Sequence, residues 1–414
     1  MVYVAILGHG VVGSGVAEVL RKNADSIAHK AGEPIEIRRI LDLREFPDLP
    51  YADKFTKEFD DILHDPDIRI VVETMGGLHP AYDFVKSCLL AGKNVVTSNK
   101  ELVAAKGDEL LEIAKNNNLN FLFEASVGGG IPILRPIDQC LAANEVYEIA
   151  GILNGTTNFI LTKMFREGVT FDSALALAQK LGYAERNPAD DVEGKDACRK
   201  ICILASLAFG SHVYPRDVYA EGITRITQED VAYAAGCGSV IKLIGRAKRG
   251  VNGAPITAMV TPAFVSHDSQ LGNVDDVFNG ILVRGDATGD VVFYGKGAGK
   301  YPTASAVVGD VIECAKATDT SPSLRWEKSN GGNVAPREDN VTAMYLRCRS
   351  FESNSLEDAV ELFGKVKALS RDGRPSNEAA FITPAATERE IDAACKKLEE
   401  KGVTILSKIR VLDY

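Results

Sequence analysis

The chain has 414 residues, of which 45% are hydrophobic and 25% charged, so it can bury a large core; this excludes a disordered chain and predicts two to three domains at about 150 residues each. Its 57 acidic residues outnumber its 47 lysines and arginines, and the net charge of −10 argues against nucleic acid or an anionic membrane surface as the main partner. No uncharged apolar run reaches about 18 residues and no basic leader precedes the first glycines, so we expect neither a transmembrane helix nor a signal peptide.

The first 124 residues alternate short apolar runs with amphipathic segments. The apolar runs predict strands at Val2–Leu7, Ile35–Leu41, Ile68–Val72, Val95–Thr97 and Leu119–Glu124. Helices are expected between them, including one from Pro80 to about Ala91. Strands that alternate with helices indicate an α/β fold with a Rossmann-type, doubly wound parallel sheet.

The turn after the first strand carries the run Gly8-x-Gly10-x-x-Gly13 and opens a helix. Glycines let the backbone approach a pyrophosphate, and free N–H groups at a helix start attract its charge. The run therefore predicts binding of a dinucleotide, although a tight strand-to-helix turn would also need glycines.

Asp42 ends the second predicted strand, where an acidic residue can accept hydrogen bonds from an adenosine ribose and favour NAD. Arg38, Arg39 and Arg44 lie close by and could instead hold the 2′-phosphate of NADP. Asp42 follows Gly13 by 29 residues, whereas the usual spacing is about 20, so it could also be a solvated turn residue. The choice between NAD and NADP stays open.

The regular alternation of strands and helices ends after Glu124. Ser126–Pro132 is a glycine-rich turn typical of a hinge, and residues 131–300 mix helices with strands. A helix is expected at Ala304–Ala317, and the polar segment 327–340 is expected to be a linker. In the tail, 341–414, the pattern predicts three strands and two helices in alternation. The strands are Thr342–Arg347, Glu378–Thr383 and Val403–Val411, and the helices between them are Leu356–Leu369 and Glu388–Lys401.

A helix expected from about Glu193 is the most informative segment for chemistry. It is nearly apolar after Ile201, but Asp196 and Lys200 lie one turn apart at the start of its apolar stripe. They could form an ordinary ion pair at the rim of a buried helix. Alternatively, burial could lower the pKa of the lysine toward neutrality and suit it to proton transfer.

Other charged residues follow strands or precede this helix. Lys100 directly follows the strand at Val95–Thr97, where open parallel sheets bind ligands, but it could also be a surface lysine at a helix start. Glu185, Asp190 and Asp191 could bind a substrate ammonium or simply form a polar loop.

Nucleophilic and metal chemistry are less expected. The eight cysteines form no Cys-x-x-Cys pair, which fits a reducing, cytoplasmic compartment, and the six histidines lack the spacing of zinc ligands. Cys198 and Cys202 are expected to fill the core. The sequence has no Gly-x-Ser-x-Gly motif of the kind that presents a nucleophilic serine. A cofactor is therefore expected to perform the chemical step that side chains cannot, while lysines and carboxylates transfer protons.

Several longer motifs resemble the homoserine dehydrogenase family. They are Val95–Lys100 (VVTSNK), Phe123–Pro132 (FEASVGGGIP), Gly151–Leu161 (GILNGTTNFIL), and the positions Leu181–Glu185, Asp190, Asp191, Gly194, Asp196, Arg199 and Lys200. The resemblance runs from residue 1 to about 318, with the motifs in the family's order. It implies the NAD- or NADP-dependent interconversion of L-homoserine and L-aspartate 4-semialdehyde, at a branch toward threonine and methionine.

The resemblance also implies roles for individual residues. Lys200 would exchange the hydroxyl proton, Asp196 would support it, and Lys100 would lie near both substrate and nicotinamide. The substrate-binding residues would be Glu185, Asp191, Tyr183 and Thr156. The cofactor-binding residues would be Gly8, Gly10, Val11, Val12, Gly13, Asp42, Arg44, Thr74, Gly76, Lys100 and Gly297. A monovalent cation such as sodium would bind the backbone carbonyls of Glu124, Val127, Gly129 and Ile131.

The implied domains are a dinucleotide-binding unit (1–130, completed by about 300–320) and a substrate-binding unit (131–300) that pairs subunits into a homodimer or homotetramer. The tail resembles an ACT regulatory domain in its element order, although its first turn, Arg349–Ser355, lacks the expected Asp-Arg-Pro-Gly type of sequence. Effector binding, for example of threonine, and a purely structural role both stay open.

Two other functions compete with the dehydrogenase. An inactive protein that senses a nucleotide or an amino acid would have no need for a proton-transfer lysine, so the joint presence of Lys100, Glu185, Asp196 and Lys200 favours an enzyme. A semialdehyde dehydrogenase would need a nucleophilic cysteine, and none of the cysteines lies in a convincing loop.

Overall fold

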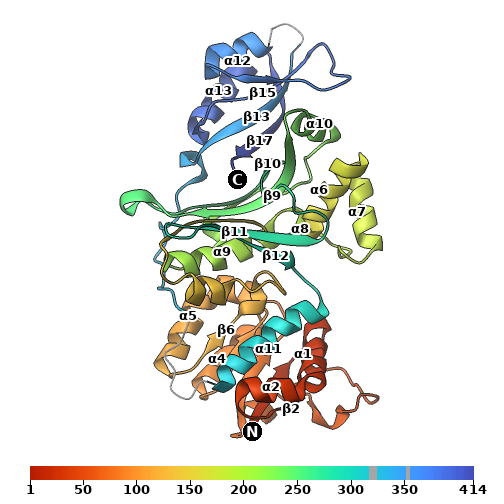
Figure 1. Cartoon of the computed structure of the whole chain (residues 1–414), viewed down its shortest axis with the longest axis vertical. Coiled ribbons are helices and arrows are strands. Elements are labelled where there is room, and N and C mark those ends of the chain that lie inside the picture. Colours follow the sequence, from red (N-terminus) through yellow and green to blue (C-terminus); the bar gives the residue numbers. More distant parts are fainter. Residues whose placement is uncertain (317–323, 351–354) are drawn as a thin grey trace.

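The computed structural model describes residues 1–316, 324–350 and 355–414. The described residues form a six-stranded and an eleven-stranded sheet, which lie one above the other along the long axis of the molecule (Figure 1). The expected helix end at Ala317 and most of the turn Arg349–Ser355 fall outside the described residues.

The six-stranded sheet is the predicted Rossmann-type sheet. Its strands, in spatial order, are β3 (Phe55–Thr56), β2 (Ile35–Leu41), β1 (Val2–Leu7), β4 (Ile68–Glu73), β5 (Asn94–Thr97) and β6 (Phe121–Leu122). All neighbours pair in parallel. The strand order reverses between β1 and β4, and ligands of such sheets bind beyond the carboxyl ends of the strands at this point.

Helices cover both faces of this sheet. They are α1 (Val11–Lys22), α2 (Ala24–Ala31), α3 (Asp60–Leu63), α4 (Ala81–Leu90), α5 (Lys100–Asn116) and α11 (Lys300–Lys316). Although α11 follows the middle region in the sequence, it returns to pack against α1, α2, β4 and β5. The helix α11 therefore packs onto the first unit rather than onto the middle region that precedes it in the sequence.

The eleven-stranded sheet is mixed and continues from the middle region into the tail. The middle region contributes β7 (Val146–Ile152), β8 (Tyr219–Ala220), β9 (Ser239–Lys248), β10 (Thr257–Ser266), β11 (Phe278–Gly285) and β12 (Gly289–Lys296). Its helices are α6 (Gly155–Glu167), α7 (Phe171–Lys180), α8 (Ala189–Val192), α9 (Lys195–Phe209) and α10 (Gln228–Gly236).

The tail adds its strands to the same sheet. Its elements are β13 (Val341–Arg349), α12 (Ser355–Phe363), β14 (Lys367–Leu369), β15 (Glu378–Ile382), β16 (Ala386–Thr387), α13 (Glu388–Glu400) and β17 (Thr404–Leu412). Apart from the two-residue β16, this is a β-α-β-β-α-β order with the strands arranged β17-β13-β15-β14, which is typical of ferredoxin-like units. β17 pairs in parallel with β10 and joins the tail to the middle region.

One predicted tail element is wrong. The sequence predicted a single helix over Leu356–Leu369, but α12 ends at Phe363 and the strand β14 follows. Gly364 adopts a left-handed backbone conformation with φ of 78°, which ends the helix and turns the chain into β14.

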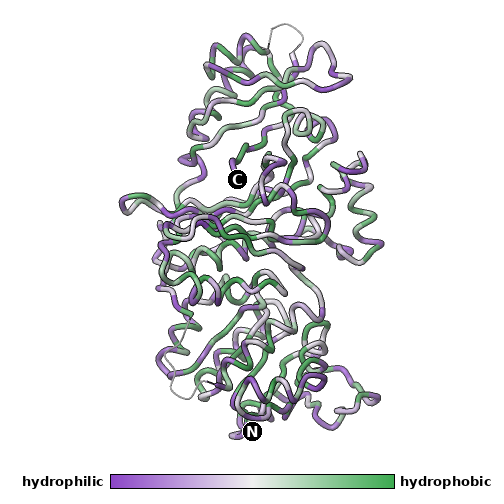
Figure 2. Tube along the Cα trace, viewed as in Figure 1, coloured by the Kyte–Doolittle hydropathy of each residue, from purple (hydrophilic) through white to green (hydrophobic). Residues whose placement is uncertain are grey.

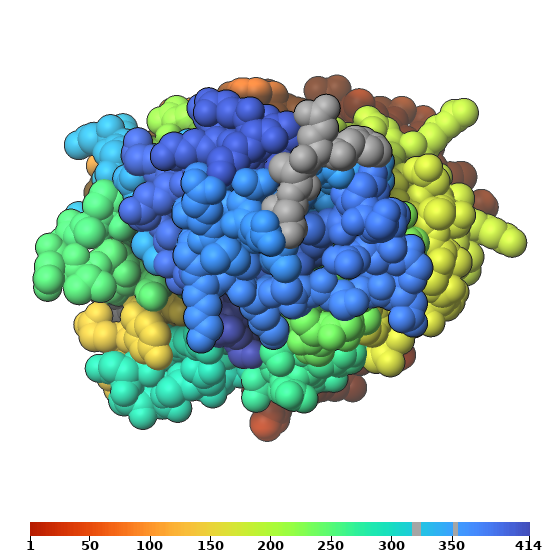
Figure 3. All heavy atoms as spheres, turned by 90° about the horizontal axis from the view of Figure 1, so that it is seen from above, coloured from red at the N-terminus to blue at the C-terminus, as the bar shows by residue number. Residues whose placement is uncertain are grey.

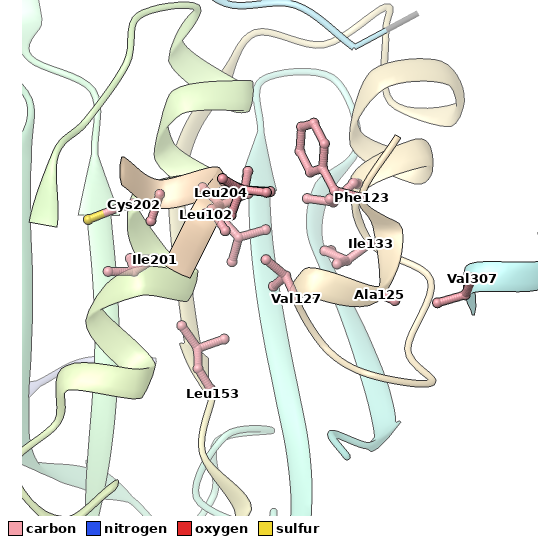
Figure 4. Packing of buried hydrophobic residues seen from close by; sticks show 14 of the residues in the cluster. Leu102, Phe123, Ala125, Val127, Ile133, Leu153, Ile201, Cys202, Leu204 and Val307 are labelled. Atoms are coloured by element: carbon pink, nitrogen blue, oxygen red, sulfur yellow. The ribbon is translucent and has the colours of Figure 1, made fainter. Parts of the chain in front are cut away.

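The core explains how the two sheets are held together. α9 contacts β7, β9 and β10 on one side and α5 of the first unit on the other, and Figure 4 shows Leu102 of α5 beside Leu204 of α9. The strands and inner helices carry most of the apolar residues, whereas polar residues gather on outer helices and loops (Figure 2). Seen from above, the tail covers the centre of one face, with α6 and α7 at its edge (Figure 3).

Candidate active site

A cleft of about 1030 Å³ lies where the first unit meets the helices of the middle region. The first unit contributes Val11 at the start of α1 and Lys100 at the start of α5. The other lining residues are Asn154, Gly155, Thr156, Gly182, Tyr183, Glu185, Asn187, Pro188, Asp190, Asp191, Asp196, Arg199, Lys200, Val277, Lys296, Gly297, Ala298 and Gly299. The cleft thus brings together the predicted catalytic and substrate-binding residues from separate parts of the chain.

The glycine turn has the geometry of a phosphate-binding loop. Gly8 has a φ of 90°, and a Cβ on Gly13 would lie 2.0 Å from the carbonyl oxygen of Gly8. Gly10, the N-cap of α1, has open space around it, and no side chain caps the helix. The first N–H groups of α1 are therefore available to an anion, which fits the pyrophosphate of a dinucleotide.

Asp42 and Arg44 lie beside the glycine turn and line a separate hollow of about 260 Å³. The carboxylate of Asp42 accepts hydrogen bonds from the backbone N–H of His9 at 2.8 Å and from the Nη2 of Arg44 at 2.8 Å. The hydrogen bonds from Arg44 lower the pKa of Asp42, although partial burial opposes them. Asp42 thus anchors the turn and orients the guanidinium of Arg44, while Arg38 pairs with Asp65 instead.

The side chain of His9, which lies between the first two glycines in the sequence, packs in an aromatic cluster. Its ring is buried and packs edge-on against Phe46 and Phe55, and its Nε2 lies 3.2 Å from the hydroxyl of Tyr51. Burial lowers the pKa of His9 and favours the neutral ring.

Two lysines share the carboxylate of Asp196. Lys200 Nζ donates to Asp196 Oδ2 at 2.8 Å and to the carbonyl oxygen of Leu153 at 2.7 Å. Lys100 Nζ, from the other unit, forms an ion pair with Asp196 Oδ1 at 2.6 Å. The Lys200 side chain is only 9% exposed, whereas that of Lys100 is 40% exposed and reaches the cleft.

The surroundings shift the two lysine pKa values in opposite directions. Burial lowers the pKa of Lys200, and the charge of Lys100 lowers it further, against the attraction of Asp196. Burial also acts to lower the pKa of Lys100, but the charge of Asp196 outweighs it and raises that pKa. Two neighbouring titratable groups whose pKa values are shifted in opposite directions are typical of proton-transfer sites.

The predicted substrate-binding residues lie around the same cleft. Thr156 Oγ1 donates to the carbonyl oxygen of Tyr183 at 2.7 Å, which ties the start of α6 to the loop before α8. Tyr183 and Glu185 are exposed to the cleft. Burial and the neighbouring charge of Asp196 raise the pKa of Asp191.

Asn154 is a polar residue of the cleft that the sequence did not single out. Its Nδ2 donates to Asp191 Oδ1 at 2.7 Å and to Asp196 Oδ2 at 2.8 Å. Asn154 lies within the family motif Gly151–Leu161, and the signal that could have singled it out is the preference for Asn at the N-cap of a helix such as α6.

The remaining predicted cofactor-binding residues lie near the cleft but do not line it. Thr74 Oγ1 donates to the carbonyl oxygen of Gly8 at 2.9 Å, and Gly76 N–H donates to the buried carboxylate of Glu73 at 3.2 Å. The other predicted cofactor residues outside the lining are Gly8, Gly10, Val12 and Gly13, which form the adjacent turn.

The segment predicted to hold a cation is buried between the units. The Glu124 carboxylate accepts N–H donors from Ile133, Leu134 and Arg135, and so fixes the turn that carries the four carbonyl groups. Gly129 lies so close to the loop at Gly297 that an added Cβ would stand 2.5 Å from the oxygen of Gly297.

Within residues 1–316, 324–350 and 355–414, no group of three or more His, Cys, Asp or Glu side chains could hold a metal ion, and no helix is both long and apolar enough to cross a membrane. No cysteine lines the cleft, so the described residues give a semialdehyde dehydrogenase no nucleophile there.

Comparisons with known proteins agree with this geometry. Residues 132–312 match a family model described as homoserine dehydrogenase, and residues 8–124 match one described as the NAD binding domain of homoserine dehydrogenase. A homoserine dehydrogenase of Synechocystis sp. is 44% identical over 84% of this chain and 82% of its own length. One from Neisseria gonorrhoeae is 35% identical over 98% of both chains.

Solved structures show the same likeness. The crystal structure of a homoserine dehydrogenase from Thiobacillus denitrificans superposes with a TM-score of 0.91 at 37% identity, over 100% of this chain and 98% of that one. A hyperthermophilic archaeal homoserine dehydrogenase in complex with NADPH superposes with a TM-score of 0.64 at 27% identity, over 76% of this chain and 97% of that one.

Proposed function

The chain belongs to the homoserine dehydrogenase family, and from that premise we propose that its cleft interconverts L-homoserine and L-aspartate 4-semialdehyde with Lys200 as the proton-transfer group. The assignment of Lys200 rests on one observation. Its side chain is buried and forms an ion pair with Asp196, whose other carboxylate oxygen pairs with Lys100. A bound NAD or NADP supplies the hydride acceptor or donor.

The hydrogen bonds of Lys200 suit it to accept a proton from one direction. A neutral amine has two N–H groups and one lone pair. When the acceptors Leu153 O and Asp196 Oδ2 take both N–H groups, the lone pair is left for the hydroxyl of the substrate. After accepting that proton, Lys200 can return it as a general acid in the reverse direction.

Other cleft residues bind the substrate in this proposal. The carboxylates of Glu185 and Asp191 hold the substrate ammonium, and Tyr183 and Thr156 line its pocket. Lys100 keeps its positive charge, holds Asp196 in its ionised form, and lies near both the substrate and the nicotinamide.

We propose that the glycine turn holds the cofactor and that NADP is accepted as well as NAD. Asp42 orients Arg44, whose exposed side chain lines the hollow beside the turn, and this charge is the group that supports contact with a 2′-phosphate. A monovalent cation on the carbonyl groups of Glu124, Val127, Gly129 and Ile131 stays a prediction, supported by the fixed turn that carries them.

We also propose an ACT-type regulatory role for the tail, pairing of subunits through the middle sheet in a homodimer or homotetramer, and a cytoplasmic location. The ferredoxin-like order of the tail strands supports the first proposal. Titration of threonine into the activity assay tests it, and activity that is constant at every concentration would remove threonine as an effector.

The direct test mixes the protein with L-homoserine and either NAD or NADP and follows the absorbance of the reduced nicotinamide. Turnover is expected with homoserine, and the ratio of the two rates gives the cofactor preference. The alternative of an inactive sensing protein is not favoured, and it would require binding of both ligands without turnover.

A further inference from the structure

Asn154 connects the two carboxylates on which the proposed reaction depends. We propose that Asn154 is a positioning residue whose amide holds Asp191 and Asp196 side by side, so that one serves Lys200 while the other faces the substrate. This inference rests on the proposed function of the cleft and goes beyond it, because Asn154 acts through its neighbours rather than on the reacting atoms.

The start of α6 fixes the orientation of the Asn154 amide. Asn154 is the N-cap of this helix, and its Oδ1 accepts from the backbone N–H of Thr157 at 2.8 Å and from the Thr157 hydroxyl at 3.0 Å. A backbone N–H can only donate, so the atom facing it must be the amide oxygen. The NH₂ group of Asn154 is therefore committed to the opposite side.

On that side both amide protons find carboxylates. Asp191 lies in α8 and Asp196 in the first turn of α9, and Gly194, with a φ of 81°, reverses the chain between the two helices. Asn154 itself is only 5% exposed. A buried donor that serves two acidic groups offsets the repulsion that would otherwise separate them.

The charged groups that face Asp191 come from two helices. Asp196 and Lys200 belong to α9, and Lys100 belongs to α5. Burial and Asp196 disfavour the ionised form of Asp191, whereas the Asn154 amide favours it. Without that amide, Asp191 would take up a proton at a higher pH and lose its attraction for the substrate ammonium.

The connection from β7 to α6 also reaches Lys200 directly. Leu153, next to Asn154, offers its carbonyl oxygen to Lys200 Nζ at 2.7 Å. Two successive residues thus position the lysine and both carboxylates. A shift of this short segment would disturb proton transfer and substrate binding together.

The test compares Asn154→Ser with the wild-type enzyme over a range of pH. Serine caps a helix as well as asparagine does but has no NH₂ group. We expect kcat/KM for homoserine to fall about 10–100-fold, its acidic limb to move to higher pH, and the KM for NADP to stay within twofold. Thr170→Ala, which removes the exposed N-cap of α7, controls for the loss of a cap alone.

A second variant, Asn154→Asp, keeps the size and the capping acceptor but replaces both donors with acceptors. The same upward shift of the acidic limb, with a larger loss of kcat/KM, is expected. It also provides the comparison if Asn154→Ser fails to fold, which circular dichroism would report. If both folded variants keep the wild-type pH profile, Asn154 only caps α6 and the inference is wrong. Failure of the proposed function would look different, because the wild-type enzyme itself would not turn over homoserine.

Discussion

Lys100 and Lys200 face the two oxygens of one carboxylate, that of Asp196, at 2.6 and 2.8 Å. One lysine belongs to α5 of the nucleotide-binding unit and the other to α9 of the middle region. The arrangement keeps Lys100 charged and lowers the pKa of Lys200 through burial and the charge of Lys100. A lysine with a lowered pKa therefore lies at the point where the two units meet.

Lys200→Met is expected to lower kcat by about 10²–10⁴-fold, the usual contribution of general acid–base catalysis. The protein should still fold, because methionine fills a similar space and Asp196 keeps its ion pair with Lys100. Steady-state rates with homoserine measure the effect, and Lys195→Met, on the exposed side of the same helix, is the matched control. Normal turnover by Lys200→Met would reduce Lys200 to an ordinary ion-pair partner.

Lys100→Met is expected to shift the pH dependence of homoserine oxidation to higher pH. The charge of Lys100 lowers the pKa of Lys200, so its removal raises that pKa, and the neutral amine needed as a base forms only at higher pH. The measurement is the dependence of kcat on pH from neutral to alkaline solution. Lys106→Met, a surface variant of the same helix, should leave the profile unchanged, and a shift of Lys100→Met to lower pH would contradict the argument.

Gly10 and Gly13 are expected to respond differently to substitution by alanine. A Cβ at Gly13 would collide with the carbonyl oxygen of Gly8 at 2.0 Å, whereas a Cβ at Gly10 would meet nothing within 4 Å. Gly13→Ala should thus lower the free energy of unfolding by about 1–3 kcal/mol. Gly10→Ala should leave stability unchanged and weaken cofactor binding, because the methyl group blocks the approach of the pyrophosphate.

Denaturant unfolding and cofactor titration of the two variants separate these effects. Equal stability of Gly13→Ala and the wild type would show that the turn can relax around the added methyl group.

The local pattern of the sequence was sufficient to predict the first sheet and the pairing of Asp196 with Lys200 in the proposed catalytic cluster. The strand predicted at Ile35–Leu41 is β2, and the predicted i,i+4 pair of Asp196 and Lys200 is present on a buried helix. Strand runs and i,i+4 neighbours are local features, and they depend on periodicity alone.

Contacts between distant segments could not be predicted in this way. The ion pair of Lys100 with Asp196 joins residues far apart in the sequence, and so does the hydrogen bond from the Asn154 amide to Asp191. Likewise, the pairing of β17 with β10 follows from how the tail packs, which no local pattern reports. The place of Lys100 directly after the strand Val95–Thr97 left a ligand-binding lysine and a surface lysine equally open, and the family motifs favoured the first.

Arg44→Ala is expected to weaken NADP binding about tenfold or more while changing NAD binding little. The side chain of Arg44 is 62% exposed and Asp42 orients its guanidinium. A charge-assisted hydrogen bond to a phosphate contributes about 1.5–3 kcal/mol. Dissociation constants of both cofactors measure the effect. Arg38→Ala is the control because Arg38 does not line the hollow beside the glycine turn, and equal losses for NAD and NADP would contradict the proposed phosphate contact.

Asp310→Asn is expected to flatten the dependence of stability on pH. Asp310 is buried in α11 beside Arg135 at 2.8 Å, and burial raises its pKa to about 7, with Glu124 adding to the effect and Arg135 opposing it. An aspartate in the unfolded chain has a pKa of about 3.9. Between these values the folded protein binds more protons than the unfolded chain, so the free energy of unfolding falls as the pH rises.

Asparagine at position 310 cannot titrate, so the variant should lose less stability than the wild type between pH 5 and 7, by up to about 2 kcal/mol. The change of hydrogen bonds to Arg135 and Glu124 adds a constant offset, and the slope against pH is therefore the informative quantity. Denaturant unfolding at several pH values measures it, with the exposed Asp172→Asn as the control. Parallel curves for Asp310→Asn and the wild type would mean that Asp310 stays ionised in the folded protein, because its ion pair with Arg135 then outweighs the cost of burial.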